Sequence, residues 1–287
     1  MNIKTCVLVV KQSAIEQSDR ARRLAARGDV TARSLIDAHN EHERTADHVR
    51  QTLANRGIEF VEMIPHKFKP SEKRKLAAAD FIVTVGGDGA VLGSSHYVRD
   101  GAMMGVNSAP HDSIGHFCFA QKSDFDEKLD DALEERLRLR KLARLVVFLD
   151  EKELPELALN DVLMAHNCPA ATTRYIIQIG SDSEEHRSSG VWVSTAAGST
   201  AGILSAGGKA MPRGSRRMQY LIRELYRERG RDYKLTRGML DENGEILIAS
   251  KMPEGEMYID GSRTKYRFQF GMRARIKLAE SDLKIFI

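Results

Sequence analysis

Short apolar runs alternate with amphipathic stretches in the first hundred residues of the chain. Residues 6–10 (CVLVV) and 81–85 (FIVTV) are typical of buried strands, and residues 58–64 predict a strand between them. The second half of the charged stretch 12–56 predicts an amphipathic helix ending at Gly57, and a short helix is expected over 72–79. Strands alternating with helices predict right-handed crossovers and therefore a parallel, Rossmann-like sheet in an α/β N-terminal domain.

From about residue 145 the pattern changes to short β-rich segments separated by turns that carry Gly, Asn or Asp. Two helices are expected beside them: a charged one over 127–144, and one over 216–229 on the apolar set Met218, Leu221, Ile222 and Leu225. We therefore expect an α/β domain over residues 1–110 and a mainly β, nucleotide-binding C-terminal domain over 111–270. A C-terminal segment over 271–287 is expected to return to the first domain.

Composition and charge limit the ligands, metal sites and partners that the chain can be expected to have. Of 287 residues, 44 are Lys or Arg and 40 are Asp or Glu, a net charge of +4 that suits small anions at least as well as nucleic acid. The three cysteines form no CxxC pair, so neither a disulfide framework nor a zinc site is indicated. No apolar stretch is long enough to span a bilayer. We expect a soluble cytoplasmic protein with no nucleic-acid or membrane partner.

Three histidines, His39, His42 and His48, fall on the long predicted helix. No cysteine or carboxylate motif accompanies them, so a solvated helix face is favoured over a metal site.

A glycine-rich turn follows the buried strand 81–85. It reads Gly86-Gly87-Asp88-Gly89, and such a turn before a helix can present backbone N–H groups to a phosphate. A carboxylate repels phosphate, so an acidic residue in a phosphate-binding turn indicates a specific role. Asp88 can hold Mg²⁺ or accept a proton from a hydroxyl that attacks the phosphate. The structural alternative is a tight turn in which Asp88 caps the next helix.

A second run of small and hydroxyl residues spans 188–202 and continues to Gly208. It follows a predicted strand and offers a close-contact surface suited to a base and a ribose. In isolation, a packing turn of small residues would explain it nearly as well. Two such loops in one chain favour a nucleotide site.

Taken in order, these motifs resemble those of the NAD kinase family, over roughly residues 83–261. The matching segments are GGDG at 86–89, GVN at 105–107 with GHF at 115–117, ND at 160–161, STAAGSTA at 194–201, LSAGG at 204–208 and DG at 260–261. GGDG alone also occurs in lipid kinases and, in a related form, in phosphofructokinases; the loop 194–201 singles out NAD kinases. Residues 188–190 and 219–224 look more like the mitochondrial-type branch.

The resemblance implies a kinase with its active site between two domains. It implies transfer of the γ-phosphoryl of ATP, with Mg²⁺ or another divalent cation, to the adenosine-ribose 2′-hydroxyl of NAD, giving NADP. Asp88 would be the catalytic base, and Gly86, Gly87 and Gly89 would surround the phosphates. The NAD contacts implied are Asn107, Asn160, Asp161, Ser189, Thr200, Ala201 and Ser205. A homodimer or homotetramer is also implied. Arg174 and Arg187 are cationic candidates, each as readily a surface arginine.

The chain departs from the family pattern at a few positions. Ala90 stands where Thr is usual, and Gly202 replaces a Tyr that packs against the nucleotide. Ser189 replaces an Asp that contacts the nicotinamide side, and Ala196-Ala197 replace a Pro and a small or hydroxyl residue. These departures leave open a kinase acting on NADH, a lipid or a sugar hydroxyl, and a non-catalytic NAD(P) sensor. The phosphoryl donor, ATP or polyphosphate, is also left open.

Overall fold

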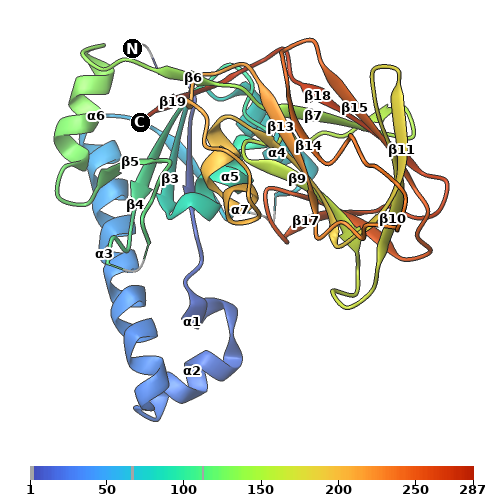
Figure 1. Cartoon of the computed structure of the whole chain (residues 1–287). Helices are drawn as coiled ribbons and strands as arrows, with labels where there is room; N and C mark the ends of the chain where they lie inside the picture. The colour runs from blue at the N-terminus through green and yellow to red at the C-terminus, as the bar shows by residue number, and fades with distance from the viewer. Residues whose placement is uncertain (1–2, 66–67, 112) are drawn as a thin grey trace. The chain divides into compact units, whose positions relative to one another are not determined.

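The computed structural model describes residues 3–65, 68–111 and 113–287, which form two compact units (Figure 1). Unit 1 comprises residues 1–140 and 284–287, and unit 2 comprises residues 141–283. The expected fold class is confirmed, with an α/β first part and a mainly β second part.

Unit 1 is built on a sheet in strand order β2-β1-β3-β4-β19-β6, with β5 also paired to β4. The pairings of β1 with β2 and β3, and of β4 with β3, β5 and β19, are all parallel. Its strands are β1 (Cys6–Val10), β2 (Phe60–Met63), β3 (Phe81–Gly86), β4 (Ala102–Asn107), β5 (Cys118–Gln121), β6 (Arg140–Leu142) and β19 (Leu283–Phe286). Its helices are α1 (Ala14–Gln17), α2 (Asp19–Ala26), α3 (Arg33–Asn55), α4 (Pro70–Ala78), α5 (Asp88–Ser95) and α6 (Phe125–Leu133), with a 3₁₀ turn at Val30–Ala32.

Both faces of this sheet are covered, which explains why its central strands are apolar throughout. Alternate residues of β1 and β3, such as Leu8 and Val83, share a core with Val49 of α3 and Leu129 of α6. Gly105 of β4 points the other way, where an added Cβ would lie 3.0 Å from a methyl of Val91 in α5. Helix α5 therefore lies close against β4, directly after the glycine-rich turn.

Unit 2 contains two six-stranded sheets, ordered β11-β10-β15-β18-β7-β8 and β14-β13-β12-β9-β16-β17, with antiparallel pairing throughout the registers described. One buried cluster contains residues of both sheets, including Ile177 and Ile246 from the first and Val162 and Val191 from the second. The first sheet consists of β7 (Leu145–Leu149), β8 (Lys152–Glu153), β10 (Thr173–Ile179), β11 (Asp182–Ser188), β15 (Glu245–Ser250) and β18 (Arg273–Leu278). The second consists of β9 (Asp161–His166), β12 (Gly190–Thr195), β13 (Met218–Arg223), β14 (Arg237–Leu240), β16 (Gly255–Ile259) and β17 (Thr264–Arg267). A 3₁₀ turn (Ala197–Thr200) and helix α7 (Gly202–Ser205) follow β12.

One predicted helix is wrong, and a second is shorter than predicted. Residues 216–229 contain strand β13, which pairs with β12 along one edge and β14 along the other, and its residues 218–222 are all buried. The charged helix expected over 127–144 ends at Leu133, and β6 begins at Arg140.

The compact units divide at Arg140 rather than at residue 110. The reason is that β5 pairs with β4, and Phe125 and Leu129 of α6 pack into the core of unit 1. At the C-terminus, β18 belongs to unit 2, and β19 pairs in parallel with β4 in unit 1.

The expected solvated histidine face is wrong for His42, which is buried and bonded through Nδ1 to the Ser108 hydroxyl at 2.8 Å. His39 Nδ1 lies 2.8 Å from the Ser13 hydroxyl, and His48 Nε2 pairs with Asp126. The sequence pattern missed these partners because each lies on another element. Within the described residues, no helix is long and apolar enough to cross a bilayer.

Candidate active site

The turn between β3 and α5 can be made only by glycine at its first position. Gly86 has φ +155°, and a Cβ there would lie 3.0 Å from both the Ala90 and the Lys11 Cβ atoms. A side chain at position 86 would therefore be strained and crowded. Gly86 is buried, Gly87 and Asp88 are half-buried and Gly89 is exposed, so accessible backbone begins at Gly87, next to the start of α5, where the helix dipole favours an anion.

Asp88 is the first residue of α5, and both of its carboxylate oxygens accept backbone hydrogen bonds. The N–H groups of His116 and Phe117 donate to Oδ2 and Oδ1 at 3.0 and 2.7 Å. The side chain is half-buried. These bonds fix the orientation of the carboxylate, and each oxygen keeps a second lone pair that can accept a proton. The GGDG turn and the segment 115–117 are thereby held together.

A cavity of about 300 Å³ lies beside Gly87 in unit 1. It is lined by Lys11, the hydroxyl residues Ser13, Ser34, Ser108 and Ser113, the imidazoles of His39 and His42, Asn107, and the small or apolar residues Ala14, Leu35, Ala38 and Ala109. Burial lowers the pKa of His42, so this imidazole is neutral. Lys11 and the hydroxyls give this cavity donors for an anionic chain, and the carboxylates of Glu16 and Glu43 lie within 4.8 Å of a ring nitrogen of His39.

Asn107, at the end of β4, uses its carboxamide to shape the next loop. Its Nδ2 donates to the Ser113 carbonyl at 2.9 Å, and its Oδ1 accepts from Ala109 N–H and the Ser113 hydroxyl, each at 3.2 Å. A Cβ on Gly115 would lie only 2.6 Å from Nδ2. Gly115, which has φ +66°, therefore allows the chain to pass over Asn107 on its way to the amides that bind Asp88.

In unit 2, the Asn160-Asp161 pair is held by Asp260. The Asp260 carboxylate accepts the N–H groups of Leu159, Asn160 and Asp161, at 2.8, 2.7 and 3.0 Å. Asp260 has φ +49°, a left-handed conformation that Asp tolerates better than most residues. One side chain thus fixes three successive backbone amides at the start of β9.

The loop after β12 packs directly on this pair. The Asn160 carbonyl accepts from Thr195 N–H at 2.9 Å and from the Ser194 hydroxyl at 3.0 Å. A Cβ on Gly198 would lie 2.1 Å from the same carbonyl oxygen, so only glycine fits there. The second glycine-rich run is therefore a close-packed partner of Asn160-Asp161.

Asp161 is 5% exposed. Burial, and next the charge of Asp260, raise the pKa of the Asp161 carboxyl to about 8. Its carboxyl is therefore mainly protonated at neutral pH and can donate a hydrogen bond to a hydroxyl or phosphate oxygen.

We expect Asp161→Asn to gain stability relative to the native chain as pH rises from 5 to 8. The raised pKa means that the folded chain holds a proton that the unfolded chain has released, so this group lowers stability between its unfolded pKa, near 4, and about 8. One such group contributes about 1.4 kcal/mol per pH unit inside that window. Urea unfolding of both proteins at several pH values measures the difference, and a pH-independent difference would contradict the assignment.

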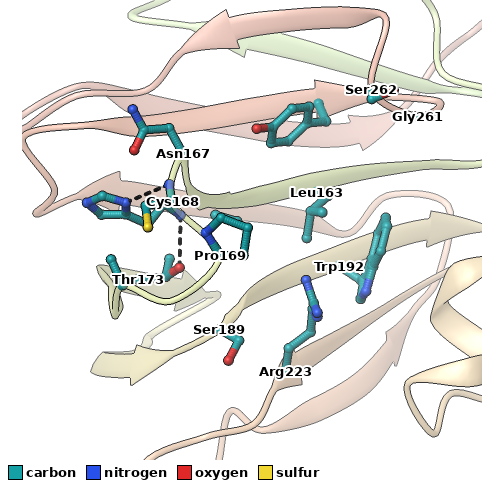
Figure 2. Close-up of a pocket in the computed structure, with 14 residues that line it drawn as sticks. Leu163, Asn167, Cys168, Pro169, Thr173, Ser189, Trp192, Arg223, Gly261 and Ser262 are labelled. Atoms are coloured by element: carbon teal, nitrogen blue, oxygen red, sulfur yellow. Dashed lines mark hydrogen bonds between the residues drawn. The ribbon is translucent and has the colours of Figure 1, made fainter.

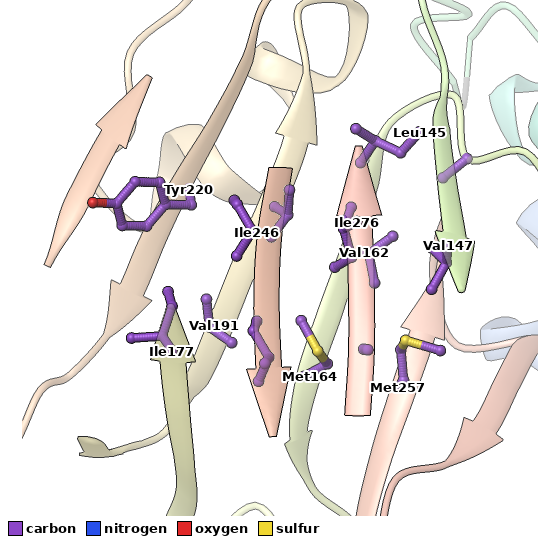
Figure 3. Packing of buried hydrophobic residues seen from close by; sticks show 14 of the residues in the cluster. Leu145, Val147, Val162, Met164, Ile177, Val191, Tyr220, Ile246, Met257 and Ile276 are labelled. Carbon is purple, nitrogen blue, oxygen red and sulfur yellow. The ribbon is translucent and has the colours of Figure 1, made fainter. Parts of the chain in front are cut away.

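A second cavity, of about 440 Å³, lies on the outer face of the second sheet of unit 2 (Figure 2). The inner face of the same strands carries core residues such as Val162, Met164 and Val191 (Figure 3). The cavity is lined by Leu163, Ala165, His166, Asn167, Cys168, Pro169, Ala171, Thr173, Ser189, Trp192, Arg223, Tyr258, Gly261 and Ser262. Strand alternation places Asp161 on the outer face too, two residues or about 7 Å from Leu163.

Cross-strand pairing sets the order of side chains along this cavity. Trp192 lies opposite Leu163, and Leu163 lies opposite Tyr258. In Figure 2, Arg223 and Trp192 extend from neighbouring strands into the same space. Arg223 is the one Lys or Arg among the lining residues, which include no Asp or Glu. Its Nε lies 3.7 Å from the carboxylate of Glu224, which is exposed.

The predicted site residues thus fall into distinct groups. Gly86, Gly87, Asp88 and Asn107 come together in unit 1, and Asn160, Asp161 and the loop 194–198 come together in unit 2. Ser189 lines the outer-face cavity. Thr200, Ala201 and Ser205 line none of the cavities described, but the neighbouring Gly202 lies against Trp192.

Of the cationic candidates, Arg187 faces Glu228 at 3.5 Å, and neither Arg174 nor Arg187 lines a described cavity. The sequence interpretation gave no role to Arg223, Trp192 or Asp260. If residues 218–223 are taken as a strand, the alternation of side chains along it places Arg223 on the outer face. The Asp-Gly turn at 260–261 was the available signal for a carboxylate that holds backbone amides.

Curated relatives extend over most of the chain. A probable NADH kinase of Oryza sativa subsp. japonica is 32% identical over 275 residues, covering 88% of this chain and 83% of the rice protein. An NADH kinase of Arabidopsis thaliana is 33% identical over 256 residues, covering 80% of each. No protein-family model matches the chain.

Solved structures agree in fold. An NAD kinase from Archaeoglobus fulgidus in complex with ATP superposes with a TM-score of 0.68 at 18% identity, over 99% of this chain and 94% of that one. Yeast NADH kinase complexed with NADH gives a TM-score of 0.74 at 15% identity, over 100% and 84% of the two chains. With the ordered motifs and the relatives of similar length, these likenesses show that the chain is an enzyme of the NAD kinase family.

Proposed function

We propose that this enzyme transfers the γ-phosphoryl group of ATP to the adenosine-ribose 2′-hydroxyl of a nicotinamide dinucleotide, and that NADH is its preferred acceptor. The observation that carries the proposal is the half-buried Asp88 carboxylate, fixed by two backbone amides at the start of α5 beside an anion-suited cavity. The rice and Arabidopsis relatives named as NADH kinases support the choice of acceptor.

In this mechanism Asp88 is the general base. The 2′-hydroxyl oxygen attacks the γ-phosphorus while its proton passes to a carboxylate oxygen of Asp88. A new P–O bond forms, the bond to the β-phosphate oxygen breaks, and ADP leaves. General-base assistance of this kind typically gives about 10²–10⁴-fold. The rest of the acceleration comes from alignment of the two reactants and neutralisation of phosphoryl charge.

The phosphates of the donor are proposed to lie at Gly86, Gly87 and Gly89 and to extend into the cavity with Lys11. Mg²⁺ held by ATP would neutralise phosphate charge when bound. Among the described residues, one group of three potential ligands is present, namely Glu16, His39 and Glu43, with ligand atoms within 4.8 Å of one another. Mg²⁺ prefers oxygen ligands, and His39 Nδ1 is already bonded to Ser13. We therefore assign Mg²⁺ to the nucleotide and not to this group.

The dinucleotide is proposed to lie on the outer face of the second sheet of unit 2. Protonated Asp161 would donate to a ribose or phosphate oxygen, and the nicotinamide end would enter the cavity lined by Ser189. The other proposed contacts are Asn107, Asn160, Thr200, Ala201 and Ser205. Among the described residues, Asn160 Oδ1 is a buried polar atom without a hydrogen bond and is available to a ligand hydroxyl.

The charges lining the outer-face cavity favour reduced over oxidised nicotinamide. The oxidised ring carries a positive charge and the reduced ring is neutral. Arg223 supplies a cation to the lining, and no carboxylate is among the lining residues. The Glu224 carboxylate, 3.7 Å from Arg223 Nε, is exposed, so solvent screens its effect on this cation. A cation near the ring raises the free energy of bound NAD and leaves bound NADH nearly unchanged.

We therefore expect Arg223→Gln and Ser189→Asp each to lower the ratio of kcat/KM for NADH to that for NAD by about threefold to tenfold. Ser189→Asn is the matched control, since it has the size of Asp without its charge and should keep the native ratio. Initial rates with saturating ATP and Mg²⁺ and either dinucleotide measure the ratio. Equal ratios in the Asp and Asn variants would contradict the electrostatic argument.

The kinase proposal itself is tested by product identity. The purified enzyme, ATP, Mg²⁺ and NADH should yield ADP and a dinucleotide phosphorylated on the adenosine ribose. Tight dinucleotide binding in calorimetry without any turnover would instead identify a sensor.

A further inference from the structure

Gly202, at the start of α7, stands where the family resemblance implies an aromatic residue, and the aromatic side chain beside it is Trp192 of β12. We propose that the half-buried Trp192, whose ring position requires glycine at 202, is the stacking platform for the nicotinamide ring and determines affinity for the dinucleotide. This inference rests on the proposed function, because it names a substrate contact in the same site.

The first observation is the fit between Trp192 and Gly202. A Cβ on Gly202 would lie 3.2 and 3.3 Å from Cζ2 and Cη2 of the Trp192 indole. The backbone at the start of α7 therefore packs against the six-membered ring of the indole, and any larger residue would push that ring away. Gly202 stands where the family resemblance implies an aromatic residue, and here the Trp192 indole lies against that position.

The second observation is the position of the indole in the outer-face cavity. Trp192 is half-buried and lines the cavity with Leu163 and Tyr258, its neighbours in one row across the sheet. In Figure 2 its ring stands upright from β12, with Leu163 beside it. A planar ring entering this cavity meets an aromatic face at one side and the apolar Leu163 next to it.

The position of Trp192 relative to Asp161 fits a dinucleotide. Ser194 lies opposite Asp161 on the neighbouring strand, and Trp192 lies two residues further along β12 on the same face. Alternate residues of a strand are about 7 Å apart, so a ribose at Asp161 leaves its attached ring within reach of the indole. Ser189, at the β11–β12 turn, lies beyond Trp192 in the same direction.

Trp192 is the one tryptophan of the chain, so native fluorescence reports this contact without any substitution. We expect NAD to quench the emission of Trp192 on binding, and nicotinamide mononucleotide to quench it at higher concentration. Oxidised NAD is the probe because it does not absorb at the emission wavelength, so its quenching requires contact. ATP and AMP should leave the emission unchanged. Binding of NAD in calorimetry without quenching would overturn the proposal.

Substitutions separate stacking from folding. Trp192→Leu should raise KM for NADH about fivefold to tenfold with KM for ATP unchanged, and Trp192→Phe should restore most of the affinity. Gly202→Ala should raise KM for NADH by displacing the indole. Gly214→Ala is its matched control, since a Cβ at Gly214 meets nothing within 4 Å. An unchanged KM in Trp192→Leu would reject the platform.

The outcomes for the inference and for the proposed function are distinct. Quenching by NAD without phosphorylation would retain the platform and reject the kinase. Phosphorylation of NADH with neither quenching nor a KM change in Trp192→Leu would retain the kinase and reject the platform.

Discussion

Asp88→Asn should lower kcat by about 10²–10⁴-fold while the enzyme remains folded and binds both substrates. The amide of Asn cannot accept the proton of the 2′-hydroxyl, but it keeps one oxygen to accept a bond from either His116 or Phe117 N–H. We therefore expect a large fall in the rate of the chemical step and only a small loss of stability in the turn. Initial rates with ATP and NADH, together with a thermal melt, measure the two effects separately.

The chain offers a matched control for this substitution. Asp80 is another carboxylate that accepts two backbone amides, those of Lys4 and Thr5, at 3.1 and 2.9 Å, and it lines none of the described cavities. Asp80→Asn weakens the same kind of backbone hydrogen bond to a carboxylate and should leave kcat unchanged. If Asp88→Asn retained kcat within a few-fold of the native value, Asp88 would not be the base.

Asp260→Ala should cause the largest loss of stability among the substitutions considered. Three backbone amides, at residues 159–161, lose the acceptor that they share. Charge-assisted bonds of this kind contribute about 1.5–3 kcal/mol each and are not fully additive, so we expect a loss of at least about 3 kcal/mol. Binding of the dinucleotide should weaken as well, because Asn160-Asp161 would no longer be held in place. Urea unfolding and calorimetry measure the two losses.

Two other substitutions at this position separate the backbone conformation from the carboxylate. Asp260→Gly keeps the positive φ at little cost but has no acceptor, so it should be nearly as destabilising as Ala. Asp260→Asn retains one acceptor and tolerates φ +49°, so it should be the mildest. It should also lower the pKa of Asp161, because the Asp260 charge contributes to raising that pKa. A ranking in which Gly equals native would show that the amides have other partners.

The sequence pattern predicted the parts of the fold that depend on local periodicity. Strands β1 and β3 are buried on both faces, and their uninterrupted apolar runs were read correctly. The glycines of the first turn were also informative, since position 86 excludes a side chain. The family resemblance, drawn from the ordered motifs, is confirmed by relatives that cover most of the chain.

What the pattern missed depends on tertiary contacts. The apolar residues of 218–223 fit the spacing of a helix as well as that of a strand, so the sequence could not distinguish the two. Because a helix was predicted, the outward position of Arg223 was not recognised. His42 was assigned to solvent because its partner Ser108 lies 66 residues away in the chain. Asp260 and Trp192 gained roles only through neighbours about 100 and 10 residues distant, Asn160 and Gly202.

A competition between NAD and NADH tests most directly whether this enzyme phosphorylates the dinucleotide with Asp88 as the base. The purified enzyme is incubated with ATP, Mg²⁺ and an equimolar mixture of NAD and NADH, and the 2′-phosphorylated products are quantified by mass spectrometry at early times. We expect both dinucleotides to be phosphorylated, with NADPH formed faster than NADP, and we expect Asp88→Asn to abolish nearly all of either product. Absence of both products from the native enzyme, with ADP formed or not, would contradict it.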